Sequence, residues 1–281
     1  CAYTHSEVEA ALADRLGEKL QRKDIDDALT DERFMLLYQP IVALAAVGTA
    51  APVRVEVLLR MLDGNKQVIT PGAFLPAASR FGLMTQIDRW VINRVFRSYA
   101  HLFVQNPQLV VGLNLSAASI ADESLADYIL QLLDNSVVKP EQVCFEMSEA
   151  SFGHHLANAS RLIHRLRAAG CGFALDNFGS GLASFTALKD LPLDFVKIDG
   201  QQLRDICSDP VDLEMVTSIN SMAHLLGIRT VAENVDNEAL LLRLKSIGVD
   251  YAQGYHLGDL LSLDKLGSAV AEPVPGEYQL N

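Results

Sequence analysis

Nine polar side chains lie at or near the ends of short apolar segments that have the character of buried strands. Asp176 shows the pattern most clearly, because the apolar run 171–175 precedes it and two glycines, Gly179 and Gly181, follow it. Glycine lets the backbone turn sharply and approach a ligand closely, although Asp and Asn are also ordinary turn residues. The full set is Gln39, Glu56, Asn114, Glu146, Asp176, Asn177, Lys197, Glu233 and Gln253.

These residue types suit phosphate chemistry with metal ions. Carboxylate and amide oxygens, without histidine or thiolate, are the ligands that hard cations such as Mg²⁺ or Mn²⁺ prefer. Two such ions can clamp a phosphodiester and activate a water molecule. A lysine in the same site, Lys197, can stabilise negative charge on phosphorus or hold that water. The set therefore predicts a metal-dependent site for a phosphate ester, although each residue taken alone is also explained as a solvated strand end.

The elements that must position these residues alternate between strands and helices. The gap between the first two strands, 34–40 and 53–60, is too short for a crossover helix, so these strands should form an antiparallel hairpin. Later strands are expected at 109–116, 143–148, 171–176, 195–199, 229–233 and 251–255, and helices at 72–80, 85–102, 123–134, 155–169, 212–226 and 238–247.

Continuous apolar strands interleaved with helices indicate a parallel sheet covered by helices, and eight of them favour a closed barrel. We therefore expect an α/β fold, a TIM-like (β/α)8 barrel with one antiparallel strand near the start. A doubly wound open sheet is the alternative, but the sequence lacks a glycine-rich dinucleotide turn after its first strand.

Composition and charge bound the class of protein. With 281 residues, 49% of them apolar, the chain is long enough for one barrel with a large core. The formal charge of −12 argues against a duplex nucleic-acid binder, which needs a basic face, but not against a small anionic ligand held through metal ions. The four cysteines form no CxxC pair, which favours buried free thiols in a reducing cytosol over disulfides or a zinc site.

The domain organisation follows from charge and spacing. Residues 1–29 have helical spacing with many charged side chains and are interpreted as a lead-in helix from an upstream domain. The barrel domain is expected over 30–265 and a C-terminal tail over 266–281. The apolar run 41–53 is short and contains Pro52, so it is not a membrane span. We expect a cytoplasmic domain cut from a longer protein, in which a sensory or membrane region precedes this chain.

The motifs together resemble the EAL domain family of bacterial cyclic-di-GMP phosphodiesterases, over about residues 34–260. The family fold is a barrel with one antiparallel strand, and the family reaction is hydrolysis of cyclic-di-GMP to linear pGpG. The resemblance rests on Tyr-Gln-Pro at 38–40, Glu-Val-Leu-Leu-Arg at 56–60, Asn-Leu-Ser at 114–116, Glu-Met-Ser-Glu at 146–149, Asp-Asn-Phe-Gly-Ser-Gly at 176–181, Val-Lys-Ile-Asp-Gly at 196–200, Ala-Glu at 232–233 and Gln-Gly-Tyr at 253–255.

The resemblance implies two metal sites for Mg²⁺ or Mn²⁺. The first ion would be held by Glu56, Asn114, Glu146 and Asp176, and Asp176 would bridge to the second. The family usually has a second Asp where this chain has Asn177. An amide keeps a carbonyl oxygen but carries no charge, so the second ion should bind more weakly here.

The resemblance also implies roles in catalysis and ligand binding. Lys197 and Glu233 would position or deprotonate the attacking water, and Gln253 would support the region of the second metal ion. Glu149 would anchor the loop that follows Asp176. The expected ligand-binding residues are Gln39, Arg60, Asp236 and Tyr255. Departures from the family pattern near this rim are Asn234 for Gly, Asp236 for Glu, Leu257 for Phe and Leu260 for Pro.

Two functions of different classes follow from these residues. The first is a cyclic-di-GMP phosphodiesterase, which the retained acids and Lys197 favour. The alternative is a catalytically degenerate receptor that binds cyclic-di-GMP and signals to a partner or upstream domain, which Asn177 and the altered segment after Tyr255 favour. An unrelated barrel that binds a sugar phosphate is a third alternative, but the sequence shows no glycine-rich phosphate loop of that kind. The expected partners are cyclic-di-GMP, a second copy of the chain, and an upstream sensory or GGDEF-type domain.

Overall fold

A computed structural model describes residues 17, 19–45, 52–179, 188, 189 and 191–269. Gly181 and most of the lead-in segment, 1–16 and residue 18, lie outside these ranges. The strands are β1 (Phe34–Ala43), β2 (Val53–Leu62), β3 (Val68–Ile69), β4 (Leu109–Leu115), β5 (Val143–Ser148), β6 (Gly172–Phe178), β7 (Phe195–Ile198), β8 (Arg229–Ala232), β9 (Tyr251–Ala252) and β10 (Leu261–Ser262).

Eight of these strands close into a barrel. The order runs β1, β2, β4, β5, β6, β7, β8, β9 and back to β1, while β3 extends β2 and β10 pairs with β1. Within the barrel β1 is antiparallel to both neighbours, β2 and β9, and the other pairs are parallel. The predicted TIM-like barrel with one antiparallel strand is therefore confirmed, and the open-sheet alternative is wrong because the β1–β9 pairing joins the two ends of the sheet.

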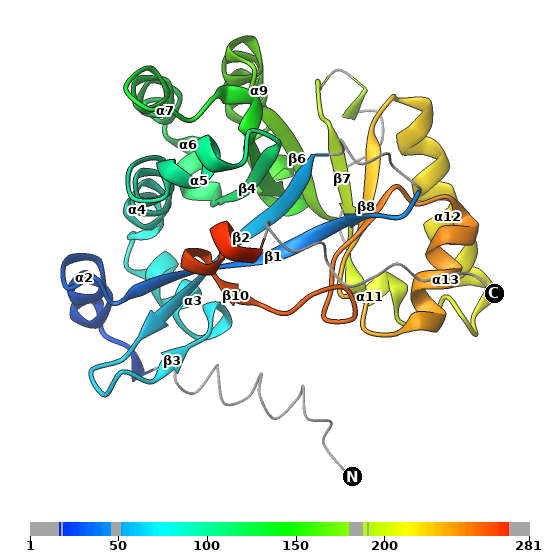
Figure 1. Cartoon of the computed structure of the whole chain (residues 1–281), viewed down its shortest axis with the longest axis horizontal. Helices are drawn as coiled ribbons and strands as arrows, with labels where there is room; N and C mark the ends of the chain where they lie inside the picture. Colours follow the sequence, from blue (N-terminus) through cyan, green and yellow to red (C-terminus); the bar gives the residue numbers. More distant parts are fainter. Residues whose placement is uncertain (1–16, 18, 46–51, 180–187, 190, 270–281) are drawn as a thin grey trace.

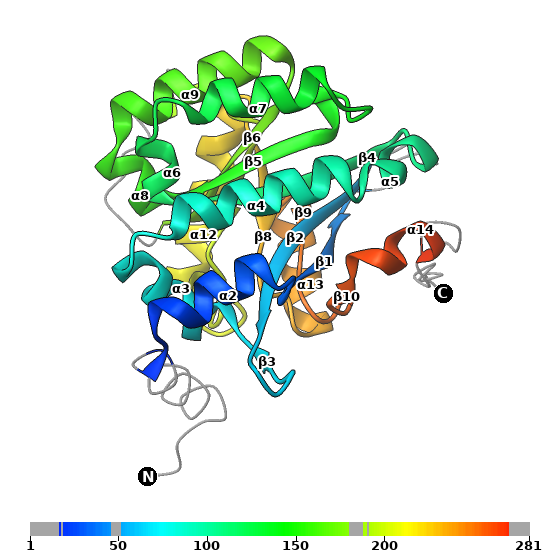
Figure 2. The same ribbon diagram turned by 90° about the vertical axis from the view of Figure 1, so that its left-hand side faces the viewer.

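Helices cover the outside of this barrel. They are α2 (Arg22–Thr30), α3 (Pro71–Arg80), α4 (Met84–Arg97), α5 (Ala100–Gln105), α6 (Ala117–Ala121), α7 (Leu125–Asp134), α8 (Glu149–His154), α9 (Leu156–Ala169), α11 (Gly200–Leu203), α12 (Pro210–Leu225), α13 (Glu238–Ile247) and α14 (Leu266–Ala269). Short 3₁₀ turns occupy Pro140–Gln142 and Leu263–Lys265. Figure 1 shows α4, α7 and α9 on one side of the barrel and α12 and α13 on the other. In Figure 2 the first three lie side by side.

Two predicted elements differ from the structure by more than a shift of a few residues at their ends. The expected helix 85–102 is divided into α4 and α5, because the amide of Tyr99 bonds back to the carbonyl of Arg94 and ends the first helix. The expected strand 251–255 pairs over only two residues. Gly254 follows that short strand at a point where the backbone of Val235 fills the space that a Cβ would need, so the chain turns away from the sheet there.

The core has an inner and an outer layer. Inside the barrel, Cys144, Ala174, Phe195 and Val231 pack together below the carboxyl ends of the strands. A larger outer cluster joins the sheet to the helices, as expected for strands that are buried on both faces. The inner layer fills the barrel floor, so the space for polar chemistry is at the carboxyl ends.

Helix α2 belongs to a third cluster of buried residues. Ile25 and Ala28 are fully buried there, with Phe74 of α3, so packing is continuous across residue 30. The domain limits 1–29, 30–265 and 266–281 stay a prediction.

Among the helices of the described ranges, none combines the length and hydrophobicity needed to span a bilayer.

The three cysteines within the described ranges are free thiols. Cys144 and Cys171 are buried, as predicted, and Cys207 is exposed. Burial raises the pKa of Cys171 to about 12 and that of Cys144 well above its usual value, so neither thiol ionises at neutral pH.

Candidate functional site

Lys197 of β7 lies at the centre of the carboxyl end of the barrel, with its side chain only 1% exposed. Its Nζ donates to Glu56 Oε2 and Glu146 Oε2, each at 2.8 Å. It also lies 2.9 Å from Glu233 Oε1 and 3.7 Å from Asp176 Oδ1. These acids come from β2, β5, the residue after β8, and β6, so closure of the barrel brings together side chains that are far apart in the sequence.

The site holds more carboxyl groups than one ammonium group can neutralise. Burial raises the pKa of Glu146 to about 8 and that of Glu233 to about 7, although Lys197 opposes both shifts. Burial acts in the same direction on Glu56, but Lys197 and hydrogen-bond donors outweigh it and lower that pKa. The surrounding carboxylates raise the pKa of Lys197 well above its usual value, against the effect of burial. Lys197 therefore stays charged, and the site as a whole favours additional positive charge.

Amide side chains complete the ring of donors around Glu56. Asn114 of β4 donates from Nδ2 to Glu56 Oε1 at 2.7 Å. Gln253 donates from Nε2 to Glu56 Oε2 at 2.8 Å and to Gln39 Oε1 at 3.1 Å. Gln39 in turn donates to the carbonyl of Gly258 at 3.4 Å. These bonds fix the Glu56 carboxylate and bring Gln39, Asn114 and Gln253 into the same site.

The end of β6 is held by contacts on both sides. Asn177 is exposed and has a positive φ of 54°, a conformation that Asn tolerates better than most residues. Its backbone amide donates to Asp176 Oδ1 at 2.8 Å, and its Nδ2 donates to Asp176 Oδ2 at 3.0 Å. Farther along, the amide of Gly179 donates to Glu149 Oε2 at 2.9 Å, and Gln202 donates to the carbonyl of Gly179.

The chain matches the EAL domain family over residues 22–259. It belongs to that family. It is 37% identical over 239 residues to the cyclic di-GMP phosphodiesterase PdeB of Shewanella oneidensis, covering 83% of this chain and 27% of that protein. It is 35% identical over 234 residues to the cyclic di-GMP phosphodiesterase PdeF of Escherichia coli, covering 83% of this chain and 31% of that protein. This chain therefore spans less than a third of the length of these two relatives.

A solved structure gives the same assignment. The cyclic-di-GMP complex of the PaMucR phosphodiesterase superimposes with a TM-score of 0.79 at 30% sequence identity, covering 87% of this chain and 98% of that chain. The closed barrel with its antiparallel first strand is thus the fold of an EAL domain.

The carboxylates of this EAL domain surround the ammonium group of Lys197. Within residues 17–269, apart from the ranges left undescribed, no group of three or more His, Cys, Asp or Glu side chains is arranged to hold a metal. The donor types nevertheless fit hard divalent cations, because they are carboxylate oxygens with one amide beside them. An ion that enters this site must therefore compete with Lys197 for the same oxygens.

Three of the predicted ligand-binding residues lie at the edge of this EAL domain's site or apart from it. The guanidinium of Arg60, in β2, donates to the carbonyl of Leu59 at 2.8 Å, and burial lowers its pKa. Tyr255 lies near Arg60 and is 67% exposed. Asp236 accepts a hydrogen bond from Asn237 at 2.6 Å and lines a different cavity of about 360 Å³, together with Arg204.

Sequence reasoning missed two residues near the EAL site. Gln202 holds the carbonyl of Gly179, and nothing in its sequence neighbourhood signals that contact. Asp88 is buried in α4 and binds the segment after β4. The sequence does indicate that this acid is buried, because Asp88 shares a helix face with the apolar residues Val91, Ile92 and Val95.

Proposed function

We propose that this EAL domain binds cyclic-di-GMP and hydrolyses it to linear pGpG with the help of two divalent cations, Mg²⁺ or Mn²⁺. The observation that supports the proposal is the group of four carboxyl side chains around Lys197 at one end of the barrel. Duplex nucleic acid is excluded from the proposal by the formal charge of −12.

The residues that would hold the ions are three carboxyl side chains of this group and two amide side chains beside them. Glu56, Asn114, Glu146 and Asp176 would hold the first ion, and Asp176 with Asn177 the second. The ions would supply positive charge that stabilises the reacting phosphate and acidifies the attacking water. Every one of these ligands except Asn114 and Asn177 carries a carboxylate, which is the preferred donor for both metals.

Lys197 and Glu233 would divide the work on the attacking water. Lys197 keeps its proton, because its pKa lies well above the usual value, so it acts as a fixed positive charge and hydrogen-bond donor. Glu233 has a pKa raised to about 7 and can therefore accept a proton near neutral pH. In the balanced reaction, one phosphorus–oxygen bond forms to water, one breaks to the ribose, and the proton from water ends on the leaving oxygen.

The remaining predicted residues would support the ligand and the loop. Gln253 would hold Glu56, Gln39 and Arg60 would contact the dinucleotide, and Glu149 would anchor Gly179. For Asp236 and Tyr255, contact with the ligand stays a proposal. Tyr255 lies beside Arg60, whereas Asp236 lines a separate cavity.

The test is turnover of cyclic-di-GMP against metal concentration, for the wild type and for Asn177→Asp. The substitution adds a charged donor beside Asp176 and should raise the rate by about tenfold at low metal, with the two curves meeting at high metal. Curves that superimpose throughout show that Asn177 is not a second-metal ligand. If both proteins bind cyclic-di-GMP but neither hydrolyses it at saturating Mn²⁺, the receptor function that Asn177 favours replaces the enzyme.

We also propose that the domain forms a homodimer through α12. Four apolar side chains on α12 are exposed at a helical spacing: Val211 (64%), Met215 (45%), Met222 (39%) and Leu225 (81%). Such a stripe on one helix marks an interaction surface. Sedimentation should give a dimer for the wild type, a monomer for Met215→Glu, and a dimer for the control Leu242→Glu on the exposed face of α13. A monomeric wild type contradicts the proposal.

The full-length protein is a further part of the proposal. Because this chain spans 27% and 31% of the two relatives, we propose that a sensory or GGDEF-type domain precedes it. We also propose that the domain itself acts in the cytoplasm, with any membrane anchor in that upstream part. The sequence of the full-length protein tests the first statement, and fractionation of extracts from cells that express this protein tests the second.

A further inference from the structure

Asp88 is a buried acid on the inner face of α4. It is 7% exposed, and burial raises its pKa. One of its oxygens, Oδ2, accepts three hydrogen bonds: from the backbone amide of Ser116 at 2.8 Å, from Ser116 Oγ at 2.6 Å and from Ser119 Oγ at 2.6 Å. No ion pair of Asp88 occurs within the described part of the chain. These three short hydrogen bonds therefore satisfy the buried carboxylate, and they tie α4 to the segment that follows β4.

The three bonds fix the segment that begins where β4 ends. Pairing between β2 and β4 stops at Val57 and Leu113, and pairing between β4 and β5 continues only to Leu115 and Met147. The backbone of Asn114 is therefore held on one side only. Leu115 is the last residue of β4 that is paired, and the residue after it, Ser116, is held through Asp88. The course of the chain directly after these last two strand residues thus depends on this contact, on the side where pairing with β2 has already ended.

The residue after Asp88 holds the other end of the same segment. Arg89 donates from Nη2 to Asp122 Oδ2 at 2.9 Å and to Ser124 Oγ at 2.7 Å, and its guanidinium lies 4.6 Å from the centre of the Tyr128 ring. Two successive residues of α4 thus bind the two ends of the short helix α6. This arrangement is more than a single helix–loop contact, because it fixes both the position and the direction of α6.

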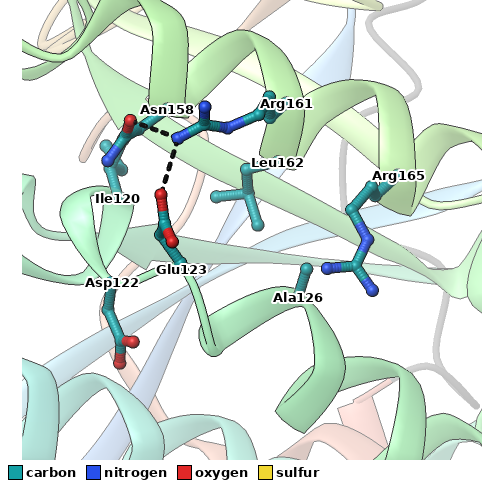
Figure 3. A pocket seen from close by; sticks show the side chains of 8 residues that line it. All are labelled: Ile120, Asp122, Glu123, Ala126, Asn158, Arg161, Leu162 and Arg165. Carbon is teal, nitrogen blue, oxygen red and sulfur yellow. Dashed lines mark hydrogen bonds and ion pairs between the residues drawn. The ribbon is translucent and has the colours of Figure 1, made fainter.

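Helix α9 holds the same segment from the other side. Asn158 donates from Nδ2 to the carbonyl of Ala121 at 3.1 Å. Figure 3 shows Arg161 lying between Asn158 and Glu123, and it bonds to both, at 2.8 Å and 2.9 Å. The segment after β4 is consequently fixed on the α4 side and on the α9 side.

We propose that Asp88 is a positioning residue for Asn114: by fixing Ser116 it directs the Asn114 amide toward Glu56 and the metal site. The inference rests on the proposed function for its metal site, but it concerns the geometry of β4. The Asn114–Glu56 hydrogen bond of 2.7 Å is the contact that Asp88 maintains. Groups that hydrogen-bond directly to a metal ligand typically change metal affinity by about 10- to 100-fold when they are removed, and Asp88 acts through Ser116, two residues from Asn114, so the low end of that range is expected.

The experiment compares Asp88→Leu with Asp88→Asn and with a matched control, Asp250→Leu. Asp250 also uses one oxygen to accept a backbone amide and a hydroxyl, both from Thr230, but at the start of β8, the opposite end of the barrel. Mn²⁺ binding is measured by electron paramagnetic resonance, stability by thermal melting, and the Asn114 side-chain amide by ¹⁵N nuclear magnetic resonance. We expect Asp88→Leu to weaken Mn²⁺ binding by about tenfold and to shift the Asn114 resonance without metal.

The other variants separate positioning from general stability. Asp88→Asn keeps an acceptor oxygen and should restore most of the affinity, whereas Asp250→Leu should lower the melting temperature and leave Mn²⁺ binding unchanged. If Asp88→Leu does not fold, Ser119→Ala removes one of the three bonds and should give a smaller change in the same direction. Wild-type affinity with an unshifted Asn114 resonance in a folded Asp88 or Ser119 variant overturns the proposal, and so does an equal loss of affinity in Asp250→Leu.

Failure of the proposed function gives a different result. If the wild type binds no Mn²⁺, the metal site itself is wrong. The Asn114 resonance of the metal-free protein is then the remaining test of the positioning role. A shift in Asp88→Leu supports positioning of Asn114 by Asp88, and an unchanged resonance refutes it.

Discussion

Lys197→Met is the most informative single substitution in this domain. Methionine has a similar length and is apolar, so it fills the space of the lysine stem and removes the charge together with the hydrogen bonds that Nζ donates. The wild-type ammonium forms ion pairs with Glu56, Glu146 and Glu233 at 2.8, 2.8 and 2.9 Å. Without it, these acids face one another in a buried site, so the metal-free protein should lose stability.

The size of the effect follows from the burial of the partners. Removing one partner of a buried ion pair typically costs about 3–5 kcal/mol. In proteins of about 150–250 residues, a loss of 1 kcal/mol in stability lowers the melting temperature by about 2–4 °C, so the melting temperature of Lys197→Met should fall by about 10 °C. The loss should grow as the pH rises, because Lys197 lowers the pKa of both Glu146 and Glu233, and without it the folded variant must keep these acids protonated at a pH at which the unfolded chain releases the protons.

Thermal melting in chelator and in Mn²⁺ tests this reasoning. A divalent cation should take the place of the missing ammonium group, so Mn²⁺ should stabilise Lys197→Met more than it stabilises the wild type. Lys245→Met removes a charge from the exposed side of α13 and is the matched control, for which no pH-dependent loss is expected. An unchanged melting temperature for Lys197→Met at about pH 8.5 in chelator refutes the idea that this lysine holds the carboxylates together.

Two further predictions concern pH and the loop after β6. The metal-free wild type should lose stability as the pH rises from about 5 to 9. The pKa values of Glu146 and Glu233 in the folded protein are about 8 and 7, above the ordinary value of 4.5, so the folded protein holds protons that the unfolded chain releases. Melting temperatures that rise over this pH range contradict the assignment. Glu149→Gln replaces the charged acceptor of the Gly179 amide with a neutral one and should lower kcat more than it lowers Mn²⁺ affinity, measured by turnover and by metal titration.

The sequence was sufficient to predict the barrel because its signals are local. Apolar runs of strand length alternate with helical spacing, and the short gap after the first strand excludes a crossover helix. Once the barrel is known, polar residues at the carboxyl ends of its strands must converge. Glu56, Glu146, Asp176 and Lys197 meet for this reason alone.

The contacts that the sequence did not reveal depend on loops and on neighbouring helices. Asp236 follows β8 by only a few residues, yet the backbone after Glu233 turns at Asn234, whose φ is 55°, and carries Asp236 to a separate cavity. Asn tolerates this left-handed conformation better than most residues, but the presence of an Asn does not by itself fix where such a turn forms. Helical periodicity places Asp88 on the apolar face of α4, but its contact with Ser116 joins an outer helix to a strand end, and no periodicity predicts that partner.

Lys197 and Asn177 act on the same balance of charge, and this balance separates the enzyme from the receptor. Four carboxyl groups share one ammonium group, which leaves the site able to accept one divalent cation with little repulsion. In the proposed site a second cation would meet the neutral amide of Asn177 beside Asp176, so its positive charge would be best balanced by the phosphates of the ligand. Binding of the second ion should therefore depend on bound cyclic-di-GMP in this domain, whereas a fifth carboxylate at position 177 would remove that dependence. A site that completes its metal shell only with ligand present can hydrolyse at high metal concentration and act as a receptor at low concentration, with the same residues in both roles.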